Sequence, residues 1–272
     1  MISPDRPVAF ATVNGAELEY EVMGDGPELV WLHGMGGNLE LERRSAAALA
    51  RHHRVLWYSS RGHGRSSAPT ERAGWSYAAL AGDLDAMLDV VGFDRPLLVG
   101  GSHGANTILR HAVEHPGRAR ALILIAPGGN ALARPARRQF APIWLMLNIA
   151  RLHGQDGLIR FVTGLNPESP EVDRDVLAAA RTHDPRELAR ALRRIPDQSA
   201  VDEPALASIQ VPAVVAAWGG DPIIHPLVLA RRIADLIPGA RFEQIAPLAG
   251  EPPQQVADRL AAFVLRWAGS LP

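Results

Sequence analysis

Short apolar runs alternate with amphipathic segments along the first half of this chain. The runs with the length and apolar content of buried strands are 28–32, 54–58, 97–99 and 121–126. The segments between them whose apolar positions recur with helical spacing are 39–51, 77–91 and 105–114. Strands that alternate with helices in this way predict a parallel sheet covered by helices on both faces.

A hairpin is expected before this alternating region. Residues 8–13 and 18–22 flank Asn14-Gly15, a pair that favours the tight turn between two antiparallel strands. We therefore expect an α/β fold whose sheet begins with two antiparallel strands and continues as a mostly parallel sheet of eight strands.

The alternation stops at Pro127 and resumes after about Ala207. Between these positions only helical patterns occur, through 140–149, 158–165, 172–180 and 187–192. Further on, strands are expected at 213–218 and 241–245, and helices at 227–237 and 254–267. A purely helical interlude predicts an insertion over the sheet. We expect a core domain of residues 1–126 and 208–272, and a helical cap of residues 127–207.

Ser102 is the strongest candidate for chemistry. It follows the apolar run 97–99 in the motif Gly100-Gly101-Ser102-His103-Gly104, and a helical pattern begins at Ala105. A Gly-x-Ser-x-Gly motif between a strand and a helix places the serine on a sharp turn, where glycines are needed because the backbones approach closely. The helix N-terminus then directs free amide groups and the positive end of its dipole towards an oxyanion formed at the serine.

Composition narrows the chemistry that this fold can carry. The chain contains no cysteine, and all 28 of its Lys+Arg residues are arginine. It therefore lacks thiol nucleophiles, thiolate metal ligands, a Schiff-base lysine and a phosphate-loop lysine. No cluster of His, Asp and Glu has metal-ligand spacing in the sequence either, so we expect an enzyme without cofactor or metal.

Charge and hydropathy indicate the partners. The formal net charge of −1 gives no support for nucleic acid or a membrane surface as the main partner. No apolar run approaches the length of a membrane span, and the first ten residues lack the apolar core of a signal peptide. We expect a cytoplasmic protein, a monomer or a homodimer, whose partner is a small-molecule substrate.

Four short motifs follow four of the expected strands. They are His33-Gly34 after 28–32, Arg61-Gly62-His63-Gly64-x-Ser66 after 54–58, the Ser102 motif after 97–99, and Gly220-Asp221-Pro222 after 213–218. In this order they resemble the capped members of the α/β-hydrolase superfamily, which include esterases, epoxide hydrolases and haloperoxidase-like enzymes. The resemblance covers nearly the whole chain, and it implies the α/β-hydrolase fold.

The resemblance also implies roles for individual residues. Ser102 would be the nucleophile and Asp221 the acid of a catalytic triad. The amides of Met35 and His103, with Gly34 beside them, would form the oxyanion hole. A cap over the crevice must offer the substrate an apolar wall, for which Trp144 and Phe161 are candidates, and His33 is expected near the same pocket.

The histidine that acts as base in the family is missing from its usual place. It normally lies between the last strand and the last helix, where either Glu251 replaces it or the histidine has been deleted, and no histidine follows His225. In one hypothesis another histidine takes over, with His225, His103 and His33 as candidates. In a second, Glu251 acts as the acid or base, because two carboxylates in a dry pocket raise each other's pKa. In a third, the protein binds a ligand without turnover.

The remaining histidines are assigned structural roles. His63 lies in the Arg-Gly-His-Gly turn and is expected to hold that turn. The others, at 52, 53, 111, 115, 153 and 183, fall on expected helices or their ends, where surface or capping positions are the simplest prediction.

Three functions follow from these hypotheses. The first is a cofactor-free enzyme acting on an ester or carbonyl group of a small, largely apolar molecule, with hydrolysis of an ester or a carbon–carbon bond as the expected reaction. The second is a lyase, isomerase or cyclase of specialised metabolism that uses Glu251 and Asp221 for proton transfer, since one fold can host several chemistries. The third is a ligand receptor without catalytic activity.

Overall fold

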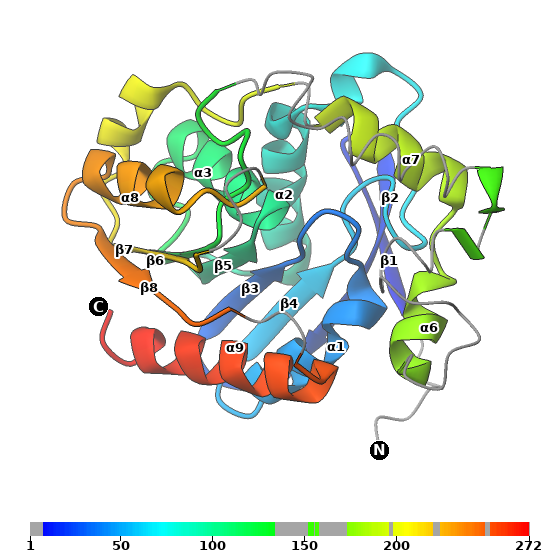
Figure 1. Ribbon diagram of the computed structural model, residues 1–272, viewed down its shortest axis with the longest axis horizontal. Coiled ribbons are helices and arrows are strands. Elements are labelled where there is room, and N and C mark those ends of the chain that lie inside the picture. Colours follow the sequence, from blue (N-terminus) through cyan, green and yellow to red (C-terminus); the bar gives the residue numbers. More distant parts are fainter. Residues whose placement is uncertain are drawn as a thin grey trace.

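The computed structural model describes residues 8–133, 152–154, 156–157, 173–195, 198–219, 224–247 and 251–271. Within these residues an eight-stranded sheet runs through the centre of the molecule, and helices lie against both of its faces (Figure 1). This is the α/β architecture that the alternating apolar pattern predicts.

The strands form at the apolar runs. In chain order they are β1 (Ala9–Val13), β2 (Ala16–Met23), β3 (Glu28–Leu32), β4 (Arg54–Tyr58), β5 (Leu97–Gly101), β6 (Ala121–Ile125), β7 (Ala213–Ala217) and β8 (Arg241–Gln244). Their order across the sheet is β1-β2-β4-β3-β5-β6-β7-β8. β2 pairs antiparallel with β1 and β4, and the other pairs are parallel. The expected hairpin therefore opens a mostly parallel sheet.

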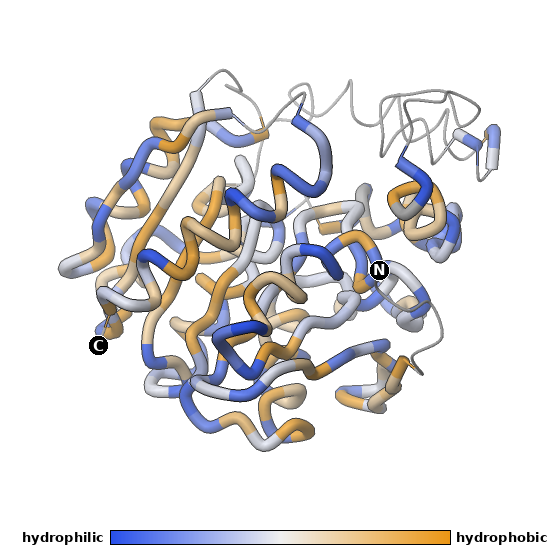
Figure 2. Tube along the Cα trace, turned by 90° about the horizontal axis from the view of Figure 1, so that it is seen from below, coloured by the Kyte–Doolittle hydropathy of each residue, from blue (hydrophilic) through white to orange (hydrophobic). Residues whose placement is uncertain are grey.

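Two sets of helices cover the two faces of the sheet. α1 (Leu39–Leu49) and α9 (Pro253–Ala268) pack on one face, and α2 (Tyr77–Val91), α3 (His103–Glu114) and α8 (Leu227–Leu236) on the other. Along β3, Trp31 belongs to the core beneath α1 and α9, whereas the next residue, Leu32, belongs to the core beneath α2 and α3. Because both faces are buried, the central strands are apolar at nearly every position. Figure 2 shows how hydrophobic and hydrophilic residues are distributed along the chain.

The described residues between β6 and β7 contain helices and no strand. They are α6 (Arg174–Ala180), α7 (Pro185–Arg194) and the 3-10 helix η4 (Glu203–Ser208). α6 packs against α1, α7 contacts the 3-10 helix η1 (Arg72–Trp75), and η4 packs against α3 and α8. Arg44 of α1 also forms an ion pair with Asp173, with 3.0 Å between Nη1 and Oδ2. This helical content agrees with a helical insertion, whose boundaries at 127 and 207 stay a prediction.

The strand order reverses direction at β3. β3 lies between β4 and β5, so the connections from β3 to β4 and from β4 to β5 run in opposite directions across the sheet. Open α/β sheets bind ligands at such a reversal, outside the carboxyl ends of the strands. The loop that begins at His33 and the turn at Ser102 follow the two strands on either side of this point.

Crossing a bilayer requires a long, uniformly apolar helix, and none of the helices in the described part of the chain meets that requirement.

Candidate active site

Ser102 occupies a strained turn between β5 and α3. Its backbone has φ 50° and ψ −108°, a conformation that is costly for any residue other than glycine. A Cβ on Gly104 would lie 2.5 Å from the carbonyl oxygen of Leu32, and a Cβ on Gly100 would lie 2.6 Å from the backbone of Gly104. Glycine is therefore required at both positions, which is the reason predicted from the motif. The turn places Ser102 at the carboxyl end of the central strand β5.

The loop after β3 is held in one orientation by His33. The His33 Nε2 atom accepts a hydrogen bond from the Ser60 amide at 2.9 Å, so the proton must lie on Nδ1, which donates to the Gly34 carbonyl at 2.7 Å. The Gly37 amide donates to the same carbonyl at 2.9 Å. The carbonyl and amide of one peptide unit point in opposite directions. With the Gly34 oxygen turned towards His33, the Met35 amide is turned the other way.

The amides of Met35 and His103 stay the predicted donors to an oxyanion. Gly34 lies against Ser102, since a Cβ there would be 3.6 Å from Ser102 Cβ. The His103 amide belongs to the first turn of α3, where helical amides have no intrahelical acceptor. Because both nitrogens of His33 are bonded within the loops and the side chain is 2% exposed, His33 supports the loop instead of forming an open pocket wall.

His225 is the candidate histidine that the structure brings to Ser102. It lies between β7 and α8, and its Nε2 atom is 3.0 Å from Ser102 Oγ. The imidazole packs against Trp218, with 5.3 Å between the ring centroids. A neutral imidazole at this distance can accept the hydroxyl proton. Of the three candidate histidines, His225 is the one hydrogen-bonded to Ser102 among the described residues.

Glu251 is engaged elsewhere. Its carboxylate forms an ion pair with Arg259 of α9, whose guanidinium also donates to the carbonyl oxygens of Ala246 and Pro247 at 3.2 and 3.3 Å. Arg259 thereby holds the two ends of the segment between β8 and α9 together. The geometry does not support Glu251 as the base.

Three predicted site residues cannot be placed. Asp221, Trp144 and Phe161 lie outside the described residues, so the triad acid and the two apolar pocket positions stay predictions.

A cluster of four buried histidines supports the loops around the site. Its members are His33, His63, His103 and His183. His183 accepts a hydrogen bond from the Gly64 amide at 2.9 Å and donates from Nε2 to the Gly36 carbonyl at 3.1 Å. The link between α6 and α7 is thereby joined to two core loops. The prediction of a surface or capping position is wrong for His183, and likewise for His53 and His111, because all three side chains are buried.

Burial also keeps these imidazoles neutral. Removal from water, reinforced by the neighbouring His33, lowers the pKa of His103 to about 3, and burial lowers the pKa of His33 and of His183 to about 4. Burial likewise lowers the pKa of His63, and the other three imidazoles add to that effect. His63 holds its own turn, as expected, through a hydrogen bond from Nδ1 to the Arg61 carbonyl at 3.2 Å.

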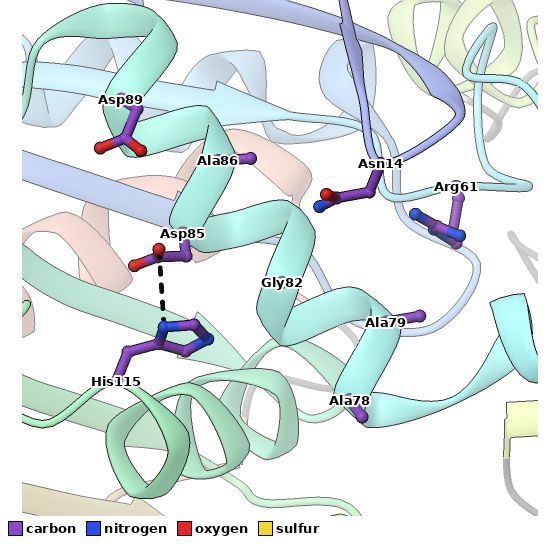
Figure 3. A pocket seen from close by; sticks show the side chains of 9 residues that line it. All are labelled: Asn14, Arg61, Ala78, Ala79, Gly82, Asp85, Ala86, Asp89 and His115. Atoms are coloured by element: carbon purple, nitrogen blue, oxygen red, sulfur yellow. Dashed lines mark ion pairs between the residues drawn. The ribbon is translucent and has the colours of Figure 1, made fainter.

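A separate pocket of about 420 Å³ lies beside α2 (Figure 3). Its walls are small side chains of α2, together with Asn14 of the hairpin turn, Arg61, and His115 at the end of α3. Arg61 is already paired with Asp83, and Asp85 with Arg118. Since neither Ser102 nor His225 lines it, this pocket is distinct from the candidate active site.

Comparison with known proteins decides the family. A family model described as alpha/beta hydrolase fold matches residues 27–250. The chain belongs to the α/β-hydrolase fold family. A Caulobacter sp. (strain K31) protein proposed to be a carbamate hydrolase is 28% identical to this α/β-hydrolase over 250 residues, covering 88% of this chain and 90% of that protein. An enol-lactonase from Burkholderia xenovorans LB400 superposes with a TM-score of 0.74 at 26% identity, covering 96% of this chain and 100% of that one.

A third relative matches over a shorter stretch. A Mycobacterium tuberculosis protein is 33% identical over 133 residues, covering 47% of this α/β-hydrolase but 38% of its own length, so the chain spans little more than a third of that relative. Across these comparisons the fold prediction is confirmed, and at the level of reaction class the named relatives support a hydrolase. They give no support to a lyase, isomerase or cyclase.

Sequence reasoning missed one group of residues near Ser102. Asn106, Asn130 and the hydroxyl of Tyr77 form a buried hydrogen-bond network next to Gly128, where a Cβ would lie 3.7 Å from Ser102 Oγ. For Asn106 a signal exists in the sequence, because a polar residue four positions after Ser102 lies on the same helix face. For Asn130 and Tyr77 the sequence carries no such signal, since long-range contacts bring them there.

Proposed function

We propose that this α/β-hydrolase is a cofactor-free serine hydrolase that cleaves an ester or a related acyl bond of a small, largely apolar molecule. The observation that carries the proposal is the 3.0 Å contact between His225 Nε2 and Ser102 Oγ. A serine hydroxyl is a weak nucleophile at neutral pH and needs a base within hydrogen-bond reach. His225 meets that requirement from a loop that differs from the one used in the family.

The first half of the reaction makes an acyl-enzyme. Ser102 Oγ attacks the carbonyl carbon while His225 Nε2 takes the hydroxyl proton, and the carbonyl oxygen becomes an oxyanion. The amides of Met35 and His103 donate to this oxyanion, and each such donor contributes on the order of 3 kcal/mol to the transition state. His225 then returns the proton to the leaving oxygen as the carbon–oxygen bond breaks.

The second half restores the enzyme. Water attacks the acyl carbon, His225 takes a proton from that water, and Ser102 leaves with the proton restored to its oxygen. The imidazolium formed in each half needs a negative partner. Asp221, which precedes His225 by four residues in the sequence, is the proposed acid.

Two features support the proposed substrate class. The relatives at 26–28% identity include an enol-lactonase and a protein proposed to be a carbamate hydrolase, both of which attack a carbonyl carbon bonded to oxygen or nitrogen. Met35 of the oxyanion loop packs against a buried apolar cluster that contains Trp75, Tyr77 and part of α7. A small apolar ester or lactone fits this chemistry better than a charged polymer.

The test is the labelling rate of Ser102 by a fluorophosphonate probe, followed by intact mass. We expect one probe per chain in the parent protein and none in Ser102→Ala. In His225→Gln the labelling rate should fall by at least about a thousandfold. Glu251→Gln serves as the comparison, and its rate should fall less than tenfold, because Glu251 pairs with Arg259.

Either of two results would overturn the proposal. If the parent protein is not labelled while remaining folded, Ser102 is not an activated nucleophile. If Glu251→Gln loses labelling and His225→Gln retains it, the carboxylate is the base and the assignment of His225 is wrong.

A further inference from the structure

The side chain of Asn106 is fully buried one helical turn after Ser102 on α3. Its Oδ1 atom accepts a hydrogen bond from the Gly128 amide at 3.1 Å. Its Nδ2 atom donates to Asn130 Oδ1 at 2.9 Å, to the Tyr77 hydroxyl at 3.2 Å and to the Gly128 carbonyl at 3.4 Å. Three of these four contacts reach residues 128–130, so the amide holds the loop that follows β6.

The same loop holds the segment that carries His225. The Gly129 amide donates to the carbonyl of Ile224 at 2.7 Å, and Ile224 is the residue immediately before His225. Asn130 anchors the far side of the loop, where its Nδ2 atom donates to the carbonyl of Gln198 at 2.9 Å. Hydrogen bonds therefore connect α3 to the loop 128–130, and the loop to the backbone beside the histidine.

This connection matters because of where the histidine lies. His225 comes from the segment between β7 and α8, so its distance from Ser102 depends on what joins that segment to α3. Ser102 immediately precedes α3, and its carbonyl accepts a hydrogen bond from the Asn106 backbone amide at 3.1 Å. The Asn106 side chain then connects this end of the helix to the loop. We propose that Asn106 is a positioning residue that sets the distance and alignment of His225 relative to Ser102 through the loop 128–130. This inference rests on the proposed function.

An asparagine suits this role for a chemical reason. Its amide supplies a donor and an acceptor in one plane, so it bonds both the amide and the carbonyl of Gly128. A leucine has the same number of side-chain heavy atoms and the same branching at Cγ, but it would leave these buried groups without a partner. The loop would then move, and a displacement of about 1 Å between reacting groups lowers a rate by roughly a hundredfold.

The test is a double-mutant cycle between Asn106 and His225. We would measure fluorophosphonate labelling of Ser102 and the hydrolysis of p-nitrophenyl acetate for Asn106→Leu, His225→Ala and the double variant. If Asn106 acts through His225, Asn106→Leu lowers the labelling rate and kcat about 10- to 100-fold in the parent protein, with KM changed less than threefold. In the His225→Ala background the same substitution changes the rate less than twofold.

Two further variants separate positioning from a loss of stability. Thr107→Val removes a buried hydrogen bond that stays within α3, from Thr107 Oγ1 to the His103 carbonyl at 3.0 Å, and it should lower the rate less than threefold. Asn106→Asp keeps an oxygen for the Gly128 amide and should recover part of the rate lost in Asn106→Leu. If Asn106→Leu does not fold, Asn106→Asp takes its place in the cycle.

The outcomes distinguish this inference from the proposal on which it rests. If His225→Ala labels at the parent rate, the assignment of the base fails and the positioning role fails with it. If His225→Ala is impaired but the Asn106 substitution lowers the rate by the same factor in both backgrounds, His225 remains the base and the positioning role of Asn106 is wrong. A folded Asn106→Leu protein with the parent rate also overturns the inference.

Discussion

At the scale of single residues, the site depends on how closely backbones approach at the nucleophile. Ser102 adopts a positive φ because the chain must reverse between β5 and α3 within a few residues. The reversal brings Gly104 against Leu32, with no space for a side chain. Gly101 belongs to the same motif, but a Cβ on it would meet no atom within 4 Å. The motif therefore contains glycines with different physical requirements.

This difference gives a matched pair of variants. Gly104→Ala should lower the free energy of unfolding by about 1–3 kcal/mol, because the added methyl group overlaps the Leu32 carbonyl and helix and strand must separate. It should also slow probe labelling, since Ser102 moves with the helix. Gly101→Ala is the control and should unfold within about 1 kcal/mol of the parent protein in urea. Equal losses in the two variants would contradict this explanation.

At the scale of elements, a buried ion pair joins the turn after β4 to α2. Arg61 Nε lies 2.6 Å from Asp83 Oδ2, and Asn14 of the hairpin turn donates to the same carboxylate at 3.3 Å. Burial raises the pKa of Asp83, and the hydrogen bond from Arg61 opposes that shift. Three segments that are distant in the sequence thus depend on one carboxylate.

Removing one partner of this pair should cost more than removing both. Arg61→Met leaves the buried Asp83 without its counter-charge and should lower the free energy of unfolding by about 3–5 kcal/mol. The double variant Arg61→Met with Asp83→Leu should regain at least half of that loss, because no uncompensated charge remains. Urea unfolding of the parent protein, Arg61→Met, Asp83→Leu and the double variant measures the coupling free energy between the two side chains. A double variant whose loss equals the sum of the single losses would show that the two side chains act independently.

At the scale of the whole molecule, four buried histidines join segments that are far apart in sequence. They come from the loop after β3, the turn after β4, the start of α3 and the link between α6 and α7. Among the described residues, no three His, Asp or Glu side chains are arranged to hold a metal ion. The cluster instead packs neutral rings and bonds the surrounding loops.

The cluster should make stability depend on pH below about 6.5. Its folded-state pKa values are lowered, to about 4 for His33 and His183 and about 3 for His103, so the unfolded chain binds more protons between these values and 6.5. The free energy of unfolding is then fully retained above pH 6.5 and falls as the pH decreases, by up to about 1.4 kcal/mol per pH unit for each histidine.

Urea unfolding between pH 4.5 and 8 measures this dependence. His183→Gln should reduce the slope below pH 6.5 by the contribution of about one proton, whereas replacing the exposed His52 with glutamine should leave it unchanged. Constant stability across this range, or a slope that His183→Gln does not alter, would contradict the role of the cluster.

The sequence predicted the fold well because the fold depends on local patterns. Each strand, each core helix and the Asn14-Gly15 hairpin appear at the expected residues, since periodic burial and turn chemistry are local properties. The 3-10 helices η1 and η4 were not predicted, because short irregular turns form where neighbouring elements require them. His53, His111 and His183 were assigned to surface or capping positions for a related reason, since the burial of a side chain depends on partners that the local pattern does not reveal.

The candidate site was likewise predictable from the sequence only in part. The sequence by itself determined that Ser102 lies in a glycine-bounded turn between a strand and a helix, that a His33-Gly34 loop follows β3, and that no histidine follows β8, because motifs with fixed spacing carry that information. Only the tertiary structure decided which of the candidate bases lies beside Ser102. His225, 123 positions further along the chain, has its Nε2 atom 3.0 Å from Ser102 Oγ, whereas Glu251 pairs with Arg259. Such contacts form where the loops after several strands pack together. Residues that are far apart in the sequence meet there, so their separation along the chain does not predict their distance in space.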